Sequence, residues 1–131
     1  MERVLRSGKI RASGYANKLR RTAFAALKDK LPAEEIVRAV GELNKKIFEV
    51  LRATNVRKDY IISIEAPFDI EFDENGQRKI KWDYDNVKIY VFVPMGVIKG
   101  LEKPEFKYTI PTEGQEFRED YDTTGETEYP T

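Results

Sequence analysis

The stretch Ile80–Pro94, IKWDYDNVKIYVFVP, decides the fold that we expect for this chain. Aliphatic side chains occupy every second position from Val87 to Val93, which is the pattern of a β-strand with one face on a core. The alternate positions hold Lys88, Tyr90 and Phe92, although the outer face of such a strand usually carries polar side chains. Rings interleaved with lysines are typical of a surface on which unpaired bases stack.

The preceding stretch predicts a strand partner for residues 80–84. Apolar side chains hold the even positions of residues 60–72, and Pro67 does not change this parity. A three-residue loop closed by Gly76 in the left-handed conformation gives the register that keeps apolar side chains opposite one another. That register pairs Ile70 with Ile80, Phe68 with Trp82, Glu71 with Lys79 and Asp69 with Lys81.

The next turn is expected at Asp85 and Asn86, because a two-residue loop accounts for the switch of apolar parity from even to odd. The resulting meander places Tyr90 beside Lys81 and Phe92 beside Lys79. We therefore expect an aromatic and basic outer sheet face, with Tyr90 and Phe92 as stacking residues. The lysines predicted to contact phosphates there are Lys79, Lys81 and Lys88.

Two amphipathic helices are expected before the strands, one from about Gly14 to Lys30 with Ser13 as its cap, and one from Ala33 to about Ala53 after Pro32. A Pro-containing loop this short predicts an αα-hairpin. The polar side of the first helix carries a basic stripe that could contact phosphates or only water: Arg11 (if the helix starts that early), Lys18, Arg21 and Lys28. The basic residues of the second helix alternate with glutamates that can pair with them.

These elements predict an α+β fold, an N-terminal αα-hairpin packed on an antiparallel β-meander. We expect one domain over residues 1–112 and an acidic tail over residues 113–131, which hold seven acids and one arginine. The formal net charge of zero conceals an asymmetry, +9 over residues 1–58 and −9 over residues 59–131. The basic half is a candidate polyanion-binding surface, or the two halves attract each other across the fold.

The composition excludes several kinds of chemistry. The chain has no cysteine and no histidine, so thiolate nucleophiles, imidazole bases and the usual zinc ligands are absent. Strand alternation accounts for the carboxylate pair Asp69 and Glu71, and turn chemistry accounts for Asp83 and Asp85. We expect no enzyme activity, no metal, no cofactor and no small-molecule substrate. No apolar run is long enough for a membrane span, and no signal peptide is evident, so we expect a cytoplasmic protein. Its charged content of 35% is typical of thermophiles.

The aromatic face has two interpretations. The rings stack on single-stranded DNA or RNA, which stacking and phosphate contacts do not distinguish. Alternatively the C-terminal segment or another subunit covers the rings, because exposed apolar patches often mark such contacts. We also expect a homo-oligomer, most simply a dimer.

Three stretches, RASGYANKLRRTAFAALKDKLP, KDYIISIEAPFDI and KIYVFVP, together resemble a family of small archaeal proteins of long-unassigned function, the ThermoDBP-like single-stranded DNA-binding proteins. The resemblance covers about Ser13–Pro94. It implies a helical hairpin against an antiparallel sheet, an apolar cleft with a basic rim that holds single-stranded DNA, and assembly into oligomers. Members carry a C-terminal helix that forms a zipper between subunits, whereas this chain has an acidic segment interrupted by Gly and Pro. Neither that oligomer nor its DNA path is therefore implied here.

Overall fold

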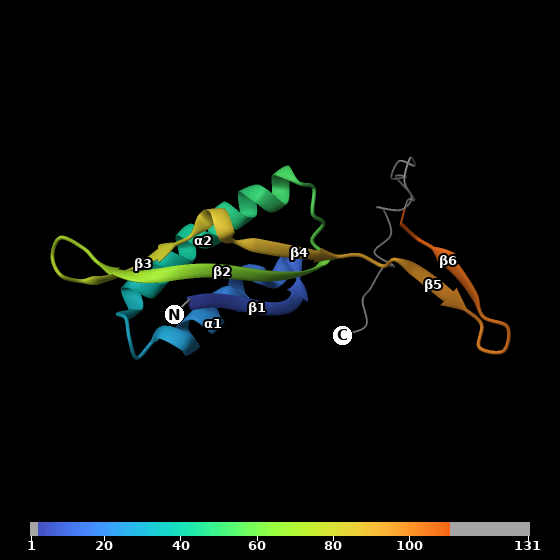
Figure 1. Cartoon of the computed structure of the whole chain (residues 1–131), viewed down its shortest axis with the longest axis horizontal. Coiled ribbons are helices and arrows are strands. Elements are labelled where there is room, and N and C mark those ends of the chain that lie inside the picture. The colour runs from blue at the N-terminus through green and yellow to red at the C-terminus, as the bar shows by residue number, and fades with distance from the viewer. Residues whose placement is uncertain (1–2, 111–131) are drawn as a thin grey trace. The chain divides into compact units, whose positions relative to one another are not determined.

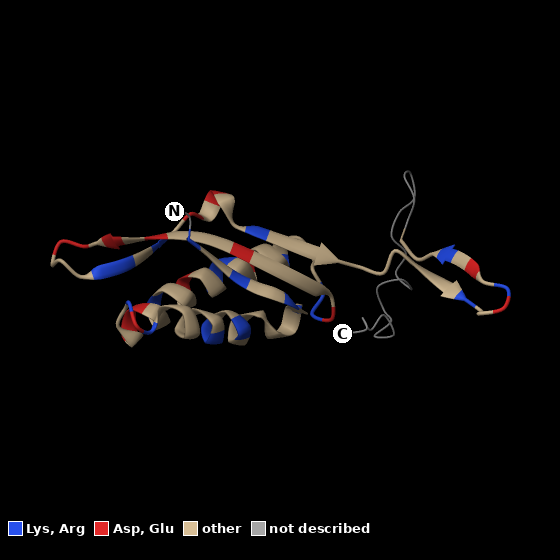
Figure 2. Cartoon of the chain, turned by 60° about the horizontal axis from the view of Figure 1, so that its bottom comes forward, with Lys and Arg blue, Asp and Glu red and all other residues tan. Residues whose placement is uncertain are grey.

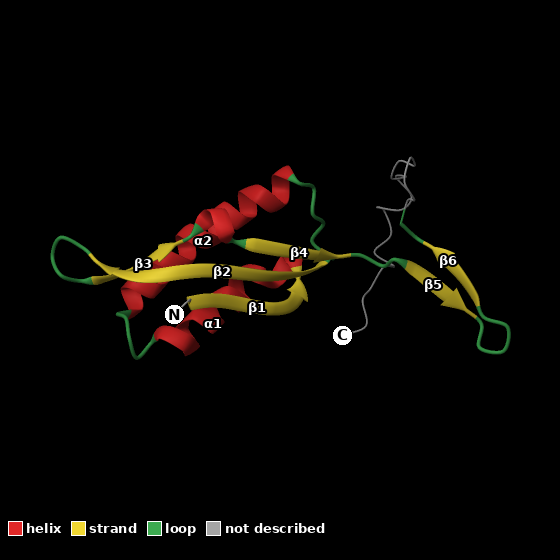
Figure 3. Ribbon diagram, in the orientation of Figure 1, coloured by secondary structure: helices red, strands yellow, loops and turns green. Residues whose placement is uncertain are grey.

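The computed structural model describes residues 3–110, and the predicted acidic tail at 113–131 lies outside them. The chain divides into two compact units between Val91 and Phe92. Figures 1 and 3 show the elements in chain order, which are β1 (Arg3–Arg11), a 3-10 turn (Ala12–Gly14), α1 (Tyr15–Leu27), α2 (Ala33–Ala53), β2 (Ile61–Phe72), β3 (Arg78–Trp82), a 3-10 turn (Tyr84–Asn86), β4 (Lys88–Phe92), β5 (Gly96–Lys99) and β6 (Glu105–Tyr108). The expected α+β class, a helical pair with antiparallel strands, is confirmed. The predicted domain limit at residue 112 stays a prediction.

Strand β2 is the partner of every other strand in the sheet of the first unit. Among the described residues, β1 pairs with one edge of β2, and β3 and β4 pair with it as well. The predicted register between β2 and β3 is confirmed, including Ile70 opposite Ile80 and Phe68 opposite Trp82. Gly76 has a φ of 75°, as the three-residue loop requires.

The expected pairing of β3 with β4 is wrong, because β4 pairs with β2. Tyr90 therefore does not lie beside Lys81, nor Phe92 beside Lys79. The reason lies at Pro67, whose carbonyl accepts a hydrogen bond from the Asp83 N–H at 2.9 Å. Proline has no N–H with which to continue the hydrogen bonds along that edge of β2, so the pairing with β3 ends there. The chain after β3 turns away from β2 in the 3-10 turn, and β4 then pairs with β2 farther along the same edge.

Strand β1 was not expected from the sequence. Leu5 and Ser7 face the core, but Ile10 pairs with Ile62, so the inward parity changes within the strand. A bulge between Arg6 and Lys9 makes this change, and Gly8 within it has a φ of 68°. The buried Ser7 hydroxyl accepts the Ile64 N–H at 2.8 Å and donates to the Gly8 carbonyl. Ser7 and Gly8 thus form the bulge of β1.

The two helices cover one face of the sheet, as Figure 2 shows. Even-numbered residues of β2 enter a core with Leu19 and Ala23 of α1 and with Ile36, Val40 and Leu43 of α2. Helix α1 begins at Tyr15, and the Ser13 side chain makes no capping hydrogen bond, contrary to expectation. Helix α2 spans the expected residues. The opposite face of the sheet has no helix over it within the first unit.

The second unit contains a hairpin of β5 and β6. Gly96 is required there because a Cβ at this position would lie 2.5 Å from the Phe106 ring. The rings of Phe106 and Tyr108 contact edge to face, with centroids 4.7 Å apart. Ile98 and Leu101 are exposed, so this hairpin stabilises itself by few buried contacts.

Candidate nucleic-acid interface

A row of three side chains crosses the outer face of the sheet. Strand pairing places Arg6 of β1 opposite Glu65 of β2, and their side chains lie 3.6 Å apart. The Tyr90 hydroxyl of β4 donates to the other oxygen of Glu65 at 3.4 Å. Tyr90 therefore shares the outer face with Arg6, and its side chain is 45% exposed. The Glu65 carboxylate thus contacts both the Tyr90 hydroxyl and the Arg6 guanidinium.

The cations of this face come mainly from β1. Lys9 pairs with Ser63 and Arg11 pairs with Ile61, while the intervening Ile10 contacts the core. By strand alternation, Arg6, Lys9 and Arg11 point to the outer face. Sequence reasoning missed this row because the bulge hides the alternation of β1. The sequence RVLRSGKIR would have predicted the row if Ser-Gly had been interpreted as a bulge, because its basic residues then fall on one face of the strand.

The predicted site residues of β3 and β4 have different surroundings. Lys88 is exposed and shares the strand parity of Tyr90. Lys81 is exposed, with its amine 3.9 Å from the Glu71 carboxylate. Lys79 is half-buried, and its amine lies 3.5 Å from Glu35, so its charge is already matched within the fold. Phe92 is half-buried, ends β4 and begins the second unit.

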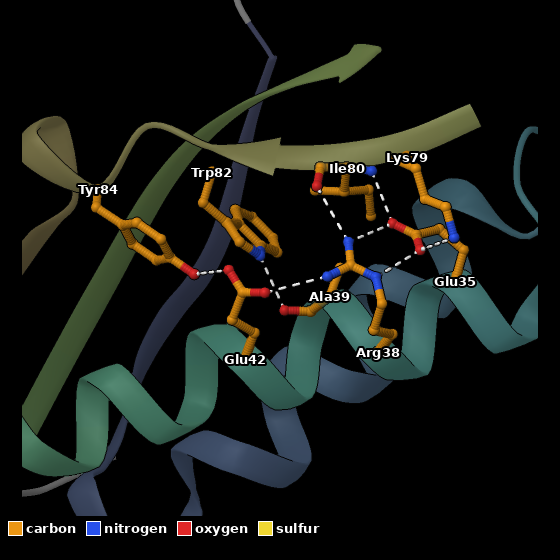
Figure 4. A network of polar contacts seen from close by, with 8 residues as sticks. All are labelled: Glu35, Arg38, Ala39, Glu42, Lys79, Ile80, Trp82 and Tyr84. Carbon is orange, nitrogen blue, oxygen red and sulfur yellow. Dashed lines mark hydrogen bonds and ion pairs between the residues drawn. The ribbon is translucent and has the colours of Figure 1, made fainter. Parts of the chain in front are cut away.

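Glu35 binds the open edge of β3, as Figure 4 shows. Its carboxylate accepts the Ile80 N–H at 2.8 Å and two hydrogen bonds from Arg38 at 2.7 Å each. Arg38 in turn donates to the Ile80 carbonyl at 3.3 Å. Side chains of α2 thus satisfy both backbone groups that an adjacent strand would otherwise bind. This contact fixes α2 against β3 and leaves the outer face uncovered.

Electrostatic interactions at this edge favour the charged forms of both Glu35 and Arg38. Burial by itself would raise the pKa of Glu35, but hydrogen bonds from Arg38 and the Ile80 N–H, with the charges of Arg38 and Lys79, hold it below its ordinary value. The hydrogen bond to Glu35 raises the pKa of Arg38 despite burial. Burial raises the pKa of Tyr84, and so does the hydrogen bond that its hydroxyl donates to Glu42.

The predicted basic stripe on the helix is divided by the structure. Lys18, Arg21 and Lys28 lie on or directly after α1, on the side away from its buried residues Leu19 and Ala23. Arg11 is instead the last residue of β1, so its assignment to this stripe is wrong. Figure 2 shows basic residues both on β1, within the sheet, and on the helical layer that covers one face of the sheet. Of the four residues of the predicted stripe, three therefore belong to the helical layer, and Arg11 belongs to the sheet.

A hollow of about 390 Å³ lies between the start of α1 and the end of α2. It is mostly apolar, with the rings of Tyr15 and Phe48 and the cations Arg52 and Lys58 among its lining residues. The Tyr15 hydroxyl donates to the Asn44 carbonyl at 3.0 Å, and burial raises its pKa. This hollow is another place in the first unit where rings and cations occur together, as is the contact of the Lys46 amine with the Tyr84 ring, 4.9 Å from its centroid.

Over residues 3–110, no group of three or more acidic side chains is placed to hold a metal ion. The helices within the same range are too short or too polar to cross a membrane.

The chain belongs to the ThermoDBP-related family of archaea, whose sequence pattern matches residues 5–77. This match confirms the resemblance seen in the sequence, and it extends into β1. A search of curated proteins found no match.

Two solved structures are similar to this chain. The crystal structure of pfuThermo-DBP-RP1 (crystal form II) is 42% identical with a TM-score of 0.60, over 69% of this chain and 58% of that one. The crystal structure of apeThermo-DBP-RP2 bound to ssDNA dT10 is 26% identical with a TM-score of 0.63, over 70% of this chain and 43% of that one. This chain therefore spans less than two thirds of either neighbour's length.

The Glu35 network predicts a pH dependence of stability. Because the folded-state pKa of Glu35 lies below the ordinary value of 4.5, its ionised form stabilises the fold above that pH, and this stability is lost as pH falls through the lower value. Between about pH 7 and about pH 3, the urea midpoint of the wild type should fall more steeply than that of Glu35→Gln. At neutral pH, Glu35→Gln should lose about 1–3 kcal/mol. Glu49→Gln, an exposed change on the same helix, should keep the wild-type slope; equal slopes for all three proteins would contradict the assignment.

Proposed function

We propose that this protein binds single-stranded DNA without sequence preference and without catalysing a reaction on it. The observation that carries the proposal is the similarity to a protein whose structure contains ssDNA dT10. The outer sheet face supports it, since an exposed ring lies beside a row of cations on a surface free of helices. A DNA ligand also implies a cytoplasmic place of action.

Tyr90 is the central stacking residue of this proposal. Its ring is anchored at one end by the hydroxyl contact to Glu65, so little side-chain freedom is lost when a base stacks on it. Phe92 follows at the same strand parity and remains the second stacking residue. Phosphates on either side of the stacked bases contact Arg6, Lys9 and Arg11 of β1 and Lys88 of β4.

Other predicted residues have smaller roles in this proposal. Lys81 adds a cation at the β3 edge, whereas Lys79 acts mainly within the fold because it faces Glu35. Lys18, Arg21 and Lys28 contact phosphates only if the bound DNA continues from the sheet to the helical layer. The hollow between α1 and α2 is an alternative path, favoured by its apolar lining and two cations. Single-stranded RNA is a further ligand of the same chemistry.

Tyr90→Ala and Phe92→Ala should each weaken binding of dT10 by about 1–3 kcal/mol, because each removes a base-stacking ring. Fluorescence anisotropy with a labelled oligonucleotide measures this loss, and sedimentation velocity on the same variants reports their assembly. Phe72→Ala is the matched control, since Phe72 is an aromatic residue that is 70% exposed on β2, away from the proposed rings. Variants that change assembly but leave affinity unchanged would identify the rings as a subunit interface.

The salt dependence distinguishes the two basic surfaces. Replacing Arg6, Lys9 and Arg11 with Gln should reduce the slope of log K against log salt by about 0.7 for each lost phosphate contact. Replacing Lys18, Arg21 and Lys28 with Gln is the matched change on α1, with the same loss of charge. A reduced slope only in the α1 variant would contradict binding of DNA to the sheet face. Equal reductions in both variants would indicate that the bound DNA contacts both layers.

A further inference from the structure

Glu65 places an acidic side chain in the middle of the outer sheet face. Its neighbours Ile64 and Ala66 are completely buried in the core, so alternation along β2 directs Glu65 to the opposite face. Its carboxylate lies 3.6 Å from Arg6 Nε on one side and accepts the Tyr90 hydroxyl at 3.4 Å on the other. A negative charge therefore lies between the cations of β1 and the ring of β4.

The charge of Glu65 has little to do with holding the fold together. The side chains of Arg6 and Glu65 are 63% and 32% exposed, and an ion pair this open to water contributes little to stability. A neutral amide of the same shape could also accept the hydrogen bond from Tyr90. The charge therefore acts mainly on whatever ligand approaches this face.

A single strand can bind this face without bringing its own charge close to Glu65. The cations of β1 attract its phosphates, and β2 lies about 4.8 Å to one side of β1. Because the bases of a single strand are unpaired, they can turn away from the phosphates and toward Glu65 and Tyr90. Uncharged bases then cover the carboxylate, and the phosphates remain over β1.

A double helix cannot avoid the carboxylate in this way. Its bases are paired inside, and a second row of phosphates follows the first across a groove about 6–12 Å wide. Since neighbouring strands of a sheet are about 4.8 Å apart, one row of phosphates over β1 brings the other over β2 or β4. Both strands are close to Glu65, and at physiological salt charges within about 8 Å of each other are only partly screened.

We propose that Glu65 is a specificity-determining residue, which makes the outer sheet face selective for single strands by repelling the second phosphate row of double-stranded DNA. This inference rests on the proposed function and adds to it a physical reason for the rejection of duplex. It assigns to one carboxylate a role that neither stacking on Tyr90 nor phosphate binding by β1 supplies.

Glu71 offers a matched control on the same strand. Its side chain is 55% exposed and its carboxylate lies 3.9 Å from the Lys81 amine, so it too belongs to an open ion pair. Six residues separate it from Glu65, about 20 Å at about 3.3 Å per residue. Glu71→Gln therefore changes the net charge as much as Glu65→Gln does, but far from Arg6 and Tyr90.

The test compares one labelled oligonucleotide of mixed sequence, as a single strand and annealed to its complement, by fluorescence anisotropy with the full chain. In Glu65→Gln the ratio of the duplex to the single-strand dissociation constant should fall by about threefold to tenfold, because the duplex gains most from loss of the repulsion. Glu65→Asp, which keeps the charge, and Glu71→Gln should both keep the wild-type ratio. Added salt should reduce the difference between wild type and Glu65→Gln.

Circular dichroism verifies that each variant is folded. An unchanged ratio in Glu65→Gln, or an equal fall in Glu71→Gln, overturns the inference and leaves single-strand binding intact. A wild type that binds both forms equally well also overturns it. Failure of the proposed function gives a different result, a wild type that binds no single strand even at low salt, and overturns both.

Discussion

The structure of the first unit depends on the two edges of β2. Odd and even residues of this strand direct their backbone groups to opposite edges, so β1 occupies one edge along Ile61–Phe68 while β3 and β4 share the other. The same alternation sends Ile62, Ile64 and Ala66 into the core and Glu65 to the outer face. Because Pro67 offers no N–H, the shared edge is interrupted there, and β4 resumes pairing at the level where Tyr90 reaches Glu65.

The open edge of β3 shows how the helical layer is held in place. Glu35 and Arg38 bind both backbone groups of Ile80, and Trp82 donates its indole N–H to the Ala39 carbonyl at 2.8 Å (Figure 4). An unpaired edge of this kind is a template for aggregation unless it is covered, and here side chains of α2 cover it. A buried ion pair contributes little net stability, yet removal of one partner would leave a charge unmatched. The network therefore fixes the orientation of α2 against β3.

Much of the fold could be predicted because side-chain parity is a strong constraint. The register of Ile70 with Ile80 follows from keeping apolar residues on one face, and both helices follow from their apolar arcs. Parity could not predict the partner of β4. It fixes only which side chains of β4 face the core, and these are the same whether β4 pairs with β3 or with β2. The bulge at Ser7 and Gly8 hid β1, and with it the row of Arg6, Lys9 and Arg11 on the outer face. The outward direction of Tyr90 was predicted because β4 alternates without interruption, whereas the neighbours expected for it came from the wrong strand.

The central claim is that single-stranded DNA lies on the outer sheet face. Its most direct test is a titration of ¹⁵N-labelled full-length protein with dT10, followed by amide chemical-shift changes residue by residue. The account predicts that the largest changes fall on β1 between Arg6 and Arg11 and on β4 around Tyr90. Changes concentrated instead on Tyr15, Phe48, Arg52 and Lys58, with β1 and β4 unaffected, would place the DNA in the hollow between the helices and contradict it.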